Sequence, residues 1–145
     1  MSVLSRRALI AITTVVDVAL HARPTPVPAK VLAARHQLGP RHLESVLNAL
    51  VRAGILKGVR GPRGGYELAR ERRRITLADI VRVAEGTPED TAGSGPPLVG
   101  MVIAPAIDRA AQAFLRELED ISVETLFAEA MKRGLQEDVA TDFTI

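Results

Sequence analysis

The sequence of 145 residues contains no cysteine and no tryptophan. The absence of cysteine excludes disulfides, thiolate chemistry, and any zinc or iron–sulfur site that is held by cysteine ligands. Aromatic residues make up only 3% of the chain, although 47% of its residues are hydrophobic. We therefore expect one folded domain with a core of Leu, Val, Ile and Ala rather than a disordered chain.

Long apolar runs are also missing. The most apolar segment, residues 8–20, follows two arginines and so has the outline of a secretory signal. However, two threonines and Asp17 interrupt the segment, and no small-residue cleavage site follows it. No segment approaches the roughly 18 apolar residues that a membrane crossing needs. We therefore expect a soluble, cytoplasmic protein with no membrane partner.

The charge is unevenly distributed along the chain, which the overall net charge of +2 hides. Residues 1–74 contain 14 Lys and Arg against 4 Asp and Glu, whereas residues 75–145 contain 5 basic and 13 acidic residues. A merely solvated surface would give a more even mixture. The asymmetry favours an interaction of the first half with a polyanion such as nucleic acid.

A helix is predicted from Ser5, a plausible N-cap, to His21. Its apolar face is expected to consist of Leu9, Ile12, Val16 and Leu20. After a stiff proline-rich connection, a short helix is predicted over residues 28–37. Gly39 and Pro40 then turn the chain into a further helix. Two short helices joined by a tight glycine turn are typical of a helix-turn-helix.

The second of these two helices, from Pro40 to Gly54, has two distinct faces at 100° per residue. Its core stripe consists of Leu43, Val46, Leu47 and Leu50. The opposite side carries Arg41, Ser45, Asn48 and Arg52, with His42 and Glu44 on the flanks. This exposed row could be ordinary solvated surface. Because each member of the central row can donate a hydrogen bond, and the row begins at the N-terminal turn, it also suits a recognition helix in a major groove.

A basic hairpin follows this helix. Two short strands, residues 55–59 and 66–68, flank the turn Gly61-Pro62-Arg63-Gly64-Gly65. The glycines are expected to supply positive φ angles, and the proline fixes φ at a turn position. Arg60 and Arg63 at the tip have no acid beside them. A solvated basic hairpin is the alternative, but the preceding helices favour the wing of a winged helix-turn-helix.

The next segments complete the predicted winged domain, residues 1–86. Residues 70–74 form a basic cluster that suits either a solvated strand edge or phosphate contacts. Thr76 is expected to cap a helix, with Asp79 at the capping-box spacing, and Gly86 ends it. Residues 87–100 are predicted to form a flexible loop. The fold class is therefore mainly α with a small β-hairpin wing.

A long C-terminal dimerisation helix is predicted within residues 101–133, starting between Met101 and Pro105, with a short helix after Ser122 and a tail over residues 134–145. Since the winged domain can close its own core, a long amphipathic helix needs a partner surface. The helix could fold back on its own domain, but a two-fold dimer is the commoner outcome. The residues expected at the dimer interface are Ile107, Ala111, Phe114, Leu115 and Leu118.

These motifs resemble the Rrf2 family of bacterial transcription regulators over nearly the whole chain except the loop. The matching pieces are His42-Leu43-Glu44, residues 59–69, residues 75–80 and residues 121–126. The resemblance implies a homodimer whose two winged heads read a palindromic operator in double-stranded DNA, with the long helices crossed between them. It further implies that Arg60 enters the minor groove and that Glu44 helps to set base preference. A carboxylate can accept a hydrogen bond from the amino group of cytosine.

The leading hypothesis is thus a sequence-specific DNA-binding regulator, expected to act as a repressor. Arg41, His42, Glu44, Ser45 and Asn48 are the candidates near base edges. The wing arginines are expected in an A·T-rich, narrow minor groove. Phosphate contacts, which fix register without reading sequence, are expected from Arg6, Arg7, Lys57 and residues 70–74.

The chain lacks the cysteine ligands that the family pattern contains. Many members hold an iron–sulfur cluster through three cysteines in the loop before the dimerisation helix. Without cysteine, cluster sensing through such ligands and thiol oxidation are excluded. His21, His36 and His42 have spacings that indicate no shared metal site, and each is interpreted as a lone surface histidine. No cofactor is expected.

The signal that such a regulator senses is left open. A small molecule could bind between the long helix and the winged domain, a partner protein could dock on the acidic half, or abundance alone could regulate the protein. The rival function is a winged-helix module for protein–protein assembly, in which Arg41, Arg60 and Arg63 could be scattered or buried in ion pairs. An enzyme is not expected, because the sequence offers no convergent catalytic set and no phosphate loop.

Overall fold

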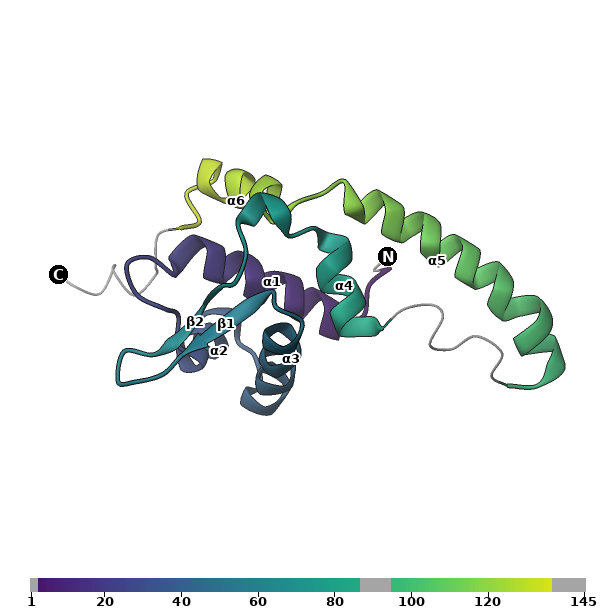
Figure 1. Ribbon diagram of the computed structural model, residues 1–145, viewed down its shortest axis with the longest axis horizontal. Helices are drawn as coiled ribbons and strands as arrows, with labels where there is room; N and C mark the ends of the chain where they lie inside the picture. The colour runs from purple at the N-terminus through teal and green to yellow at the C-terminus, as the bar shows by residue number, and fades with distance from the viewer. Residues whose placement is uncertain (1–2, 87–94, 137–145) are drawn as a thin grey trace.

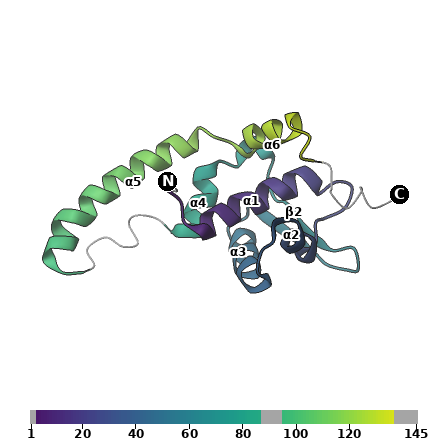
Figure 2. The ribbon, with the colours of Figure 1, turned by 180° about the vertical axis from the view of Figure 1, so that it is seen from behind.

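The computed structural model describes residues 3–86 and 95–136. In chain order, the elements are α1 (Arg6–His21), α2 (Ala29–His36), α3 (Pro40–Arg52), β1 (Leu56–Val59), β2 (Gly65–Leu68), the 3₁₀ turn η1 (Arg72–Arg74), α4 (Leu77–Glu85), the π-helical turn η3 (Val99–Ile103), α5 (Ala104–Glu119) and α6 (Val123–Lys132). Helices α1–α4, the hairpin β1–β2, η1 and α6 form the head, and α1 runs through its middle (Figure 1). Helix α3 and the hairpin project from one side of α1, α6 lies on the other side, and α5 extends away as a long arm (Figures 1 and 2). The predicted fold class is confirmed.

Capping residues set the helix ends as the sequence predicts. Ser5 accepts a hydrogen bond from the Ala8 amide at the start of α1. Thr76 and Asp79 form a reciprocal capping box at the start of α4, with both bonds at 3.0 Å. Gly39 is the N-cap of α3 and Pro40 opens that helix. These local signals were readable because each depends on a side chain and the amides within one turn of it.

The buried face of α1 differs from the predicted one. Ala8, Ala11, Val15 and Val18 face the core, whereas Leu9 is 46% exposed and the other three predicted residues are only partly buried. The prediction of Leu9, Ile12, Val16 and Leu20 was therefore wrong. Since α1 is apolar around most of its circumference, hydrophobic periodicity alone does not distinguish the adjacent faces.

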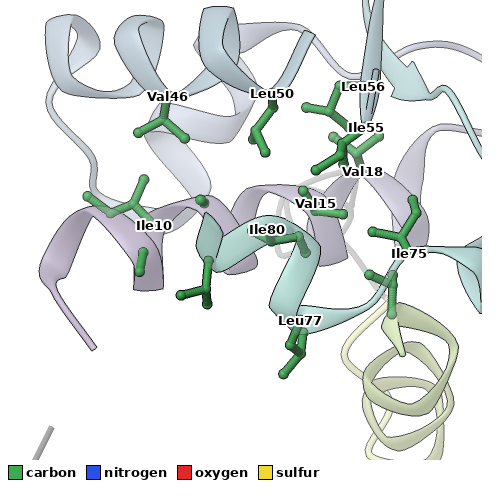
Figure 3. Close-up of a cluster of buried hydrophobic side chains, with 14 of the residues drawn as sticks. Ile10, Val15, Val18, Val46, Leu50, Ile55, Leu56, Ile75, Leu77 and Ile80 are labelled. Atoms are coloured by element: carbon green, nitrogen blue, oxygen red, sulfur yellow. The ribbon is translucent and has the colours of Figure 1, made fainter. Parts of the chain in front are cut away.

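The core lies where α1, α3 and α4 meet at the base of the hairpin. Figure 3 shows Ile10, Val15 and Val18 of α1 packed against Leu50 of α3 and Ile80 of α4. Leu115 and Leu118 from the C-terminal end of the arm belong to the same cluster, as does Val123 of α6. The division of the chain into domains at residue 86 stays a prediction. The core of the head contains residues from both sides of that boundary.

Backbone hydrogen bonds join the start of α4, before the arm, to the segment that leads from the arm into α6. The Leu77 amide donates to the Ile121 carbonyl at 2.8 Å, and the Val123 amide donates to the Ile75 carbonyl at 2.8 Å. Arg82 on α4 also pairs with Glu119 at the end of α5 at 2.6 Å. The C-terminal end of the arm is therefore fixed to the head.

The outer part of the arm has an apolar surface. Six large apolar side chains are exposed at the N-cap of η3, in η3 and in α5: Leu98, Val99, Met101, Val102, Ile103 and Ile107. None of the helices within residues 3–86 and 95–136 has the length and apolarity that a membrane crossing requires.

Candidate nucleic-acid interface

Helix α3 presents the two faces that the sequence predicts. Leu43, Val46, Leu47 and Leu50 are buried, which confirms the core stripe. The six residues on the remaining surface, Arg41, His42, Glu44, Ser45, Asn48 and Arg52, are all exposed. Helix α3 itself projects from the head (Figure 1), so a helix with this exposed row could be received by a groove of DNA.

The N-terminus of α1 lies beside this surface. The Arg7 guanidinium donates a hydrogen bond from Nη1 to the Ser45 hydroxyl at 2.9 Å. The structure thus brings together one residue predicted to contact phosphate and one predicted to contact a base. Arg6, the other predicted phosphate contact on α1, is exposed.

The hairpin has an antiparallel register that pairs Leu56 with Leu68 and Val59 with Gly65. Gly61 adopts a φ of 117°, so the predicted need for a positive φ is confirmed there. Gly64 and Gly65 have a different reason. A Cβ at Gly64 would overlap the Val59 carbonyl, and one at Gly65 would overlap the backbone at Val27.

The approach at Gly65 lets the hairpin bond to the segment before α2. The Tyr66 amide donates to the Val27 carbonyl at 2.8 Å, and the Val27 amide donates to the Tyr66 carbonyl at 3.0 Å. The wing is therefore anchored to the helix-turn-helix by main-chain bonds, which hold its base in a fixed relation to α2.

The tip arginines are free of acids. Arg60 and Arg63 are exposed, and within the described part of the chain neither pairs with an Asp or Glu; the same holds for Arg41 on α3. Arg41 and the wing belong to elements on one side of α1 (Figures 1 and 2). Exposed cations without internal partners are available to a polyanion.

The remaining predicted phosphate contacts have different surroundings. Lys57 Nζ lies 3.8 Å from Glu67 Oε1 at the base of the hairpin. Arg70 lies 3.8 Å from Asp79. Arg72 bonds Glu124 at 2.6 Å, and Arg73 bonds Glu71 at 2.9 Å. The Arg72 guanidinium also stacks over Phe127 of α6, 3.6 Å from the ring centroid. Within the cluster 70–74, residues Arg72–Arg74 form a 3₁₀ turn rather than the predicted strand edge.

Two of the three histidines are not lone surface residues, so that interpretation was wrong for them. His21 Nδ1 lies 3.2 Å from one carboxylate oxygen of Asp17, and His36 Nε2 lies 2.5 Å from the other. Arg35 donates to both oxygens at 2.8 and 2.9 Å. His42 alone is exposed as predicted.

This Asp17 cluster, consisting of Asp17, His21, Arg35 and His36, ties α2 to α1. Asp17 is only 3% exposed. Burial raises the pKa of its carboxyl, but hydrogen bonds from His36 and Arg35, with the charges of Arg35 and His21, outweigh burial and hold the pKa below the ordinary value of 3.8. The sequence signal that could have revealed the cluster is an acid within an apolar helix, with a histidine one turn later.

The five predicted dimer residues lie along one stripe but in different surroundings. Ile107 is 62% exposed, and Ala111 and Phe114 are partly buried. Leu115 and Leu118 are buried in the core of the chain's own head. The stripe therefore begins in solvent and ends inside the head, and the inner part of α5 does fold back, which was the alternative considered for the whole helix.

Comparison with known proteins gives one consistent match. The model of the Rrf2 family, described as an iron-dependent transcriptional regulator, matches residues 4–129. The HTH-type transcriptional regulator IscR of Xenorhabdus nematophila is 33% identical over 92 residues, which cover 63% of this chain and 56% of that protein. The chain thus spans about half the length of the curated relatives that it matches.

Solved structures extend the match to the arm. IscR of T. potens has a TM-score of 0.70 and 30% identity, covering 88% of this chain and 87% of that chain. CymR (YrzC), the global cysteine regulator of B. subtilis, has a TM-score of 0.69 and 27% identity, covering 89% of this chain and 98% of that one. Each of these proteins is named as a regulator.

The donor set of this chain does not fit the cluster of an iron–sulfur regulator. The whole sequence has no cysteine. Within residues 3–86 and 95–136, no group of three or more His, Asp or Glu side chains is arranged to hold a metal ion. In the Asp17 cluster, the Arg35 guanidinium, whose charge would repel a cation, occupies both oxygens of the carboxylate.

Proposed function

The chain belongs to the Rrf2 family, and from this premise we propose that it is a sequence-specific DNA-binding transcriptional regulator that acts as a homodimer. The observation that carries the proposal is a set of three exposed arginines that pair with no acid among residues 3–86 and 95–136: Arg41 on α3, and Arg60 and Arg63 on the wing. An assembly module would have no need to leave three guanidinium groups unpaired on the same side of the head.

In the proposed complex, the N-terminal turn of α3 enters the major groove. Arg41, Ser45 and Asn48 meet base edges there, and Glu44 accepts from a cytosine amino group. The Arg7–Ser45 hydrogen bond keeps a cation next to the polar row, where it can reach the adjoining phosphate. Because the Val27–Tyr66 bonds fix the base of the wing, the wing loses little conformational freedom when Arg60 and Arg63 enter the neighbouring minor groove.

The proposed dimer uses the outer part of the arm. η3 and the first turns of α5 expose several large apolar side chains, among which Met101 is 77% and Ile107 62% exposed. The head buries the other end of the same stripe, so a second copy is the natural cover for the outer end. Two-fold symmetry then places two recognition helices on one duplex, and half-sites about 34–36 Å apart or a multiple of that distance would match them.

The dimer is tested by adding charge to the stripe. Ile107→Glu, combined with Met101→Glu, is expected to convert a dimer into a monomer in light scattering coupled to size exclusion. Gln112→Glu adds one charge at an exposed polar position of α5 and serves as the matched control. A double variant that keeps the mass of the wild-type dimer, with unchanged circular dichroism, would remove the outer arm from the interface.

DNA recognition is tested by selecting bound sequences from random duplexes. The expected result is an enriched, inverted-repeat sequence, since a two-fold dimer reads two equivalent half-sites. Enrichment of a single half-site would contradict the dimeric mode while leaving DNA recognition in place. No enrichment at low salt would favour the assembly module instead. A repressor is then expected to compete with RNA polymerase at promoters that contain the selected sequence.

A further inference from the structure

A second group of cations lies away from α3 and the tip of the wing. A cavity of about 500 Å³ opens between the C-terminal end of α1, the base of the hairpin, the turn after β2 and the first turn of α6. Its lining contains five cations, Arg23, Lys57, Arg70, Arg72 and Arg73, against three acids, Glu67, Glu71 and Glu124. The lining is therefore positively charged overall.

Arg23 differs from the other four cations of the cavity. Lys57, Arg70, Arg72 and Arg73 each lie within 4.0 Å of an acid. Arg23 follows α1, is exposed, and has no hydrogen-bond or ion-pair partner among residues 3–86 and 95–136. Its guanidinium, which has five N–H donors in a planar fork, matches carboxylate and phosphate oxygens.

The cavity also has an apolar floor. Ala22, which follows α1, and Leu68 of β2 line it. Both residues are partly buried and so still present apolar surface. An apolar floor under a charged rim suits a molecule with a short hydrocarbon body and a charged group, because each part then meets its complement. A rim that served only to hold surface ion pairs would require neither the hollow nor the floor.

We propose that this cavity binds a small anionic metabolite through carboxylate or phosphate groups, with Arg23 as the first contact, and that the bound anion regulates DNA binding. The regulatory half of the proposal rests on the proposed function. Glu67 and Glu124 limit affinity, because a ligand must compete with them for Lys57 and Arg72. Binding is therefore expected to be selective for anions of two or more charges over chloride.

The position of the cavity explains how an occupant could reach the wing. Lys57 and Glu67 face each other across β1 and β2, at the base of the hairpin that presents Arg60 and Arg63. Glu124 belongs to α6, which is bonded to the start of α4 next to the end of the arm. An anion that draws Lys57 and Arg72 inward changes the contacts of both the hairpin and α6. Coupling of this kind is reciprocal, so operator DNA must alter anion affinity by the same factor.

The site is tested without DNA, by calorimetric titration of the full chain with citrate and with inorganic phosphate. Arg23→Gln is expected to weaken binding by about fivefold or more, the effect of one close charge near a protein surface. Glu67→Gln is expected to strengthen binding, because it removes a competing carboxylate. Arg116→Gln, which neutralises an exposed arginine of α5 outside the cavity, is the matched control and should leave binding unchanged.

Opposite effects of Arg23→Gln and Glu67→Gln support the site, and the better probe separates carboxylate from phosphate chemistry. Equal affinity in all three variants, or no heat with either probe, overturns it. DNA affinity is measured separately in a chloride buffer that contains neither citrate nor phosphate. A loss of DNA affinity in Arg23→Gln under these conditions would mean that a DNA phosphate occupies the cavity, which also overturns the proposal. If anions bind but no operator exists, the site stands and the proposed function fails.

Discussion

Arginines on the two sides of α1 differ in what surrounds them. On the side of α3 and the wing, Arg41, Arg60 and Arg63 are exposed and pair with no acid of the described chain. On the other side, Arg72 and Arg73 hold Glu124 and Glu71. The second group lies in the densest basic run of the sequence, yet its charge is used inside the molecule. Partners, rather than local charge density, separate the surface that is proposed to bind DNA from cations that are paired within the molecule.

The largest effect is expected where a cation is paired with a buried acid. Asp17→Ala removes the buried carboxylate that Arg35 and two histidines contact, and removing one partner of a buried pair costs about 3–5 kcal/mol. Urea unfolding of the variant measures this cost. Glu71→Ala, which removes the exposed partner of Arg73, should change the free energy of unfolding by less than about 1 kcal/mol. Equal costs in the two variants would abolish the distinction between buried and surface pairs.

Acid provides a second test of the same cluster. The pKa of Asp17 is lowered in the folded state, so its ionised form stabilises the fold above the ordinary value of 3.8. This stabilisation is lost as the pH falls below 3.8 and through the lower, folded-state pKa. The difference in unfolding free energy between wild type and Asp17→Asn should therefore shrink between pH 6 and pH 2. A difference that stays constant over this range would show that the pKa of Asp17 is the same in the folded and unfolded states.

The next effect concerns DNA rather than stability. Arg60→Ala is expected to weaken operator binding by about 1–3 kcal/mol, the range for one specific contact. Arg116→Ala removes an exposed arginine of α5, outside both the wing and the cavity, and should leave operator affinity unchanged. Fluorescence anisotropy with the selected operator measures both variants. A loss of the same size in Arg116→Ala would mean that the effect reflects overall charge rather than a contact of the wing.

The smallest effect is expected at the ion pair between Arg72 and Glu124. Glu124→Gln removes the charge that Arg72 meets across η1 and α6, and such partly exposed pairs contribute about 0.2–1 kcal/mol. The cation–π contact of Arg72 with Phe127 remains in this variant and should preserve the position of α6. Thermal unfolding measures the change. A cost above about 2 kcal/mol would mean that the pair acts as a buried one.

Features that depend on neighbouring residues could be predicted from the sequence. The capping box at Thr76, the Gly39-Pro40 helix start and the two-faced α3 each follow from chemistry within one or two turns. The wing was found for the same reason, since its glycines and arginines are contiguous. The prediction of positive φ held at Gly61 only, because close backbone approach at Gly64 and Gly65 depends on segments that fold against the hairpin.

Features that depend on distant partners could not be predicted in this way. The Asp17 cluster joins residues of α1 and α2 that no local spacing relates. The acids that pair with Arg72 and Arg70 come from α6 and α4. The sequence alone therefore overstates how many cations of residues 70–74 are available to a partner. The division of α5 into a buried inner end and an exposed outer end depends on where the chain turns back, which amphipathic periodicity does not contain.

The two main-chain bonds between the starts of α4 and α6 have a consequence for how such a protein can change over time. Because Leu77 and Val123 are clamped to Ile121 and Ile75, the head closes at the point where the arm returns. Residues of η3 and the first turns of α5 lie outside this closure, so substitutions there leave it intact. The outer arm can thus acquire different contacts over time while the head keeps its shape.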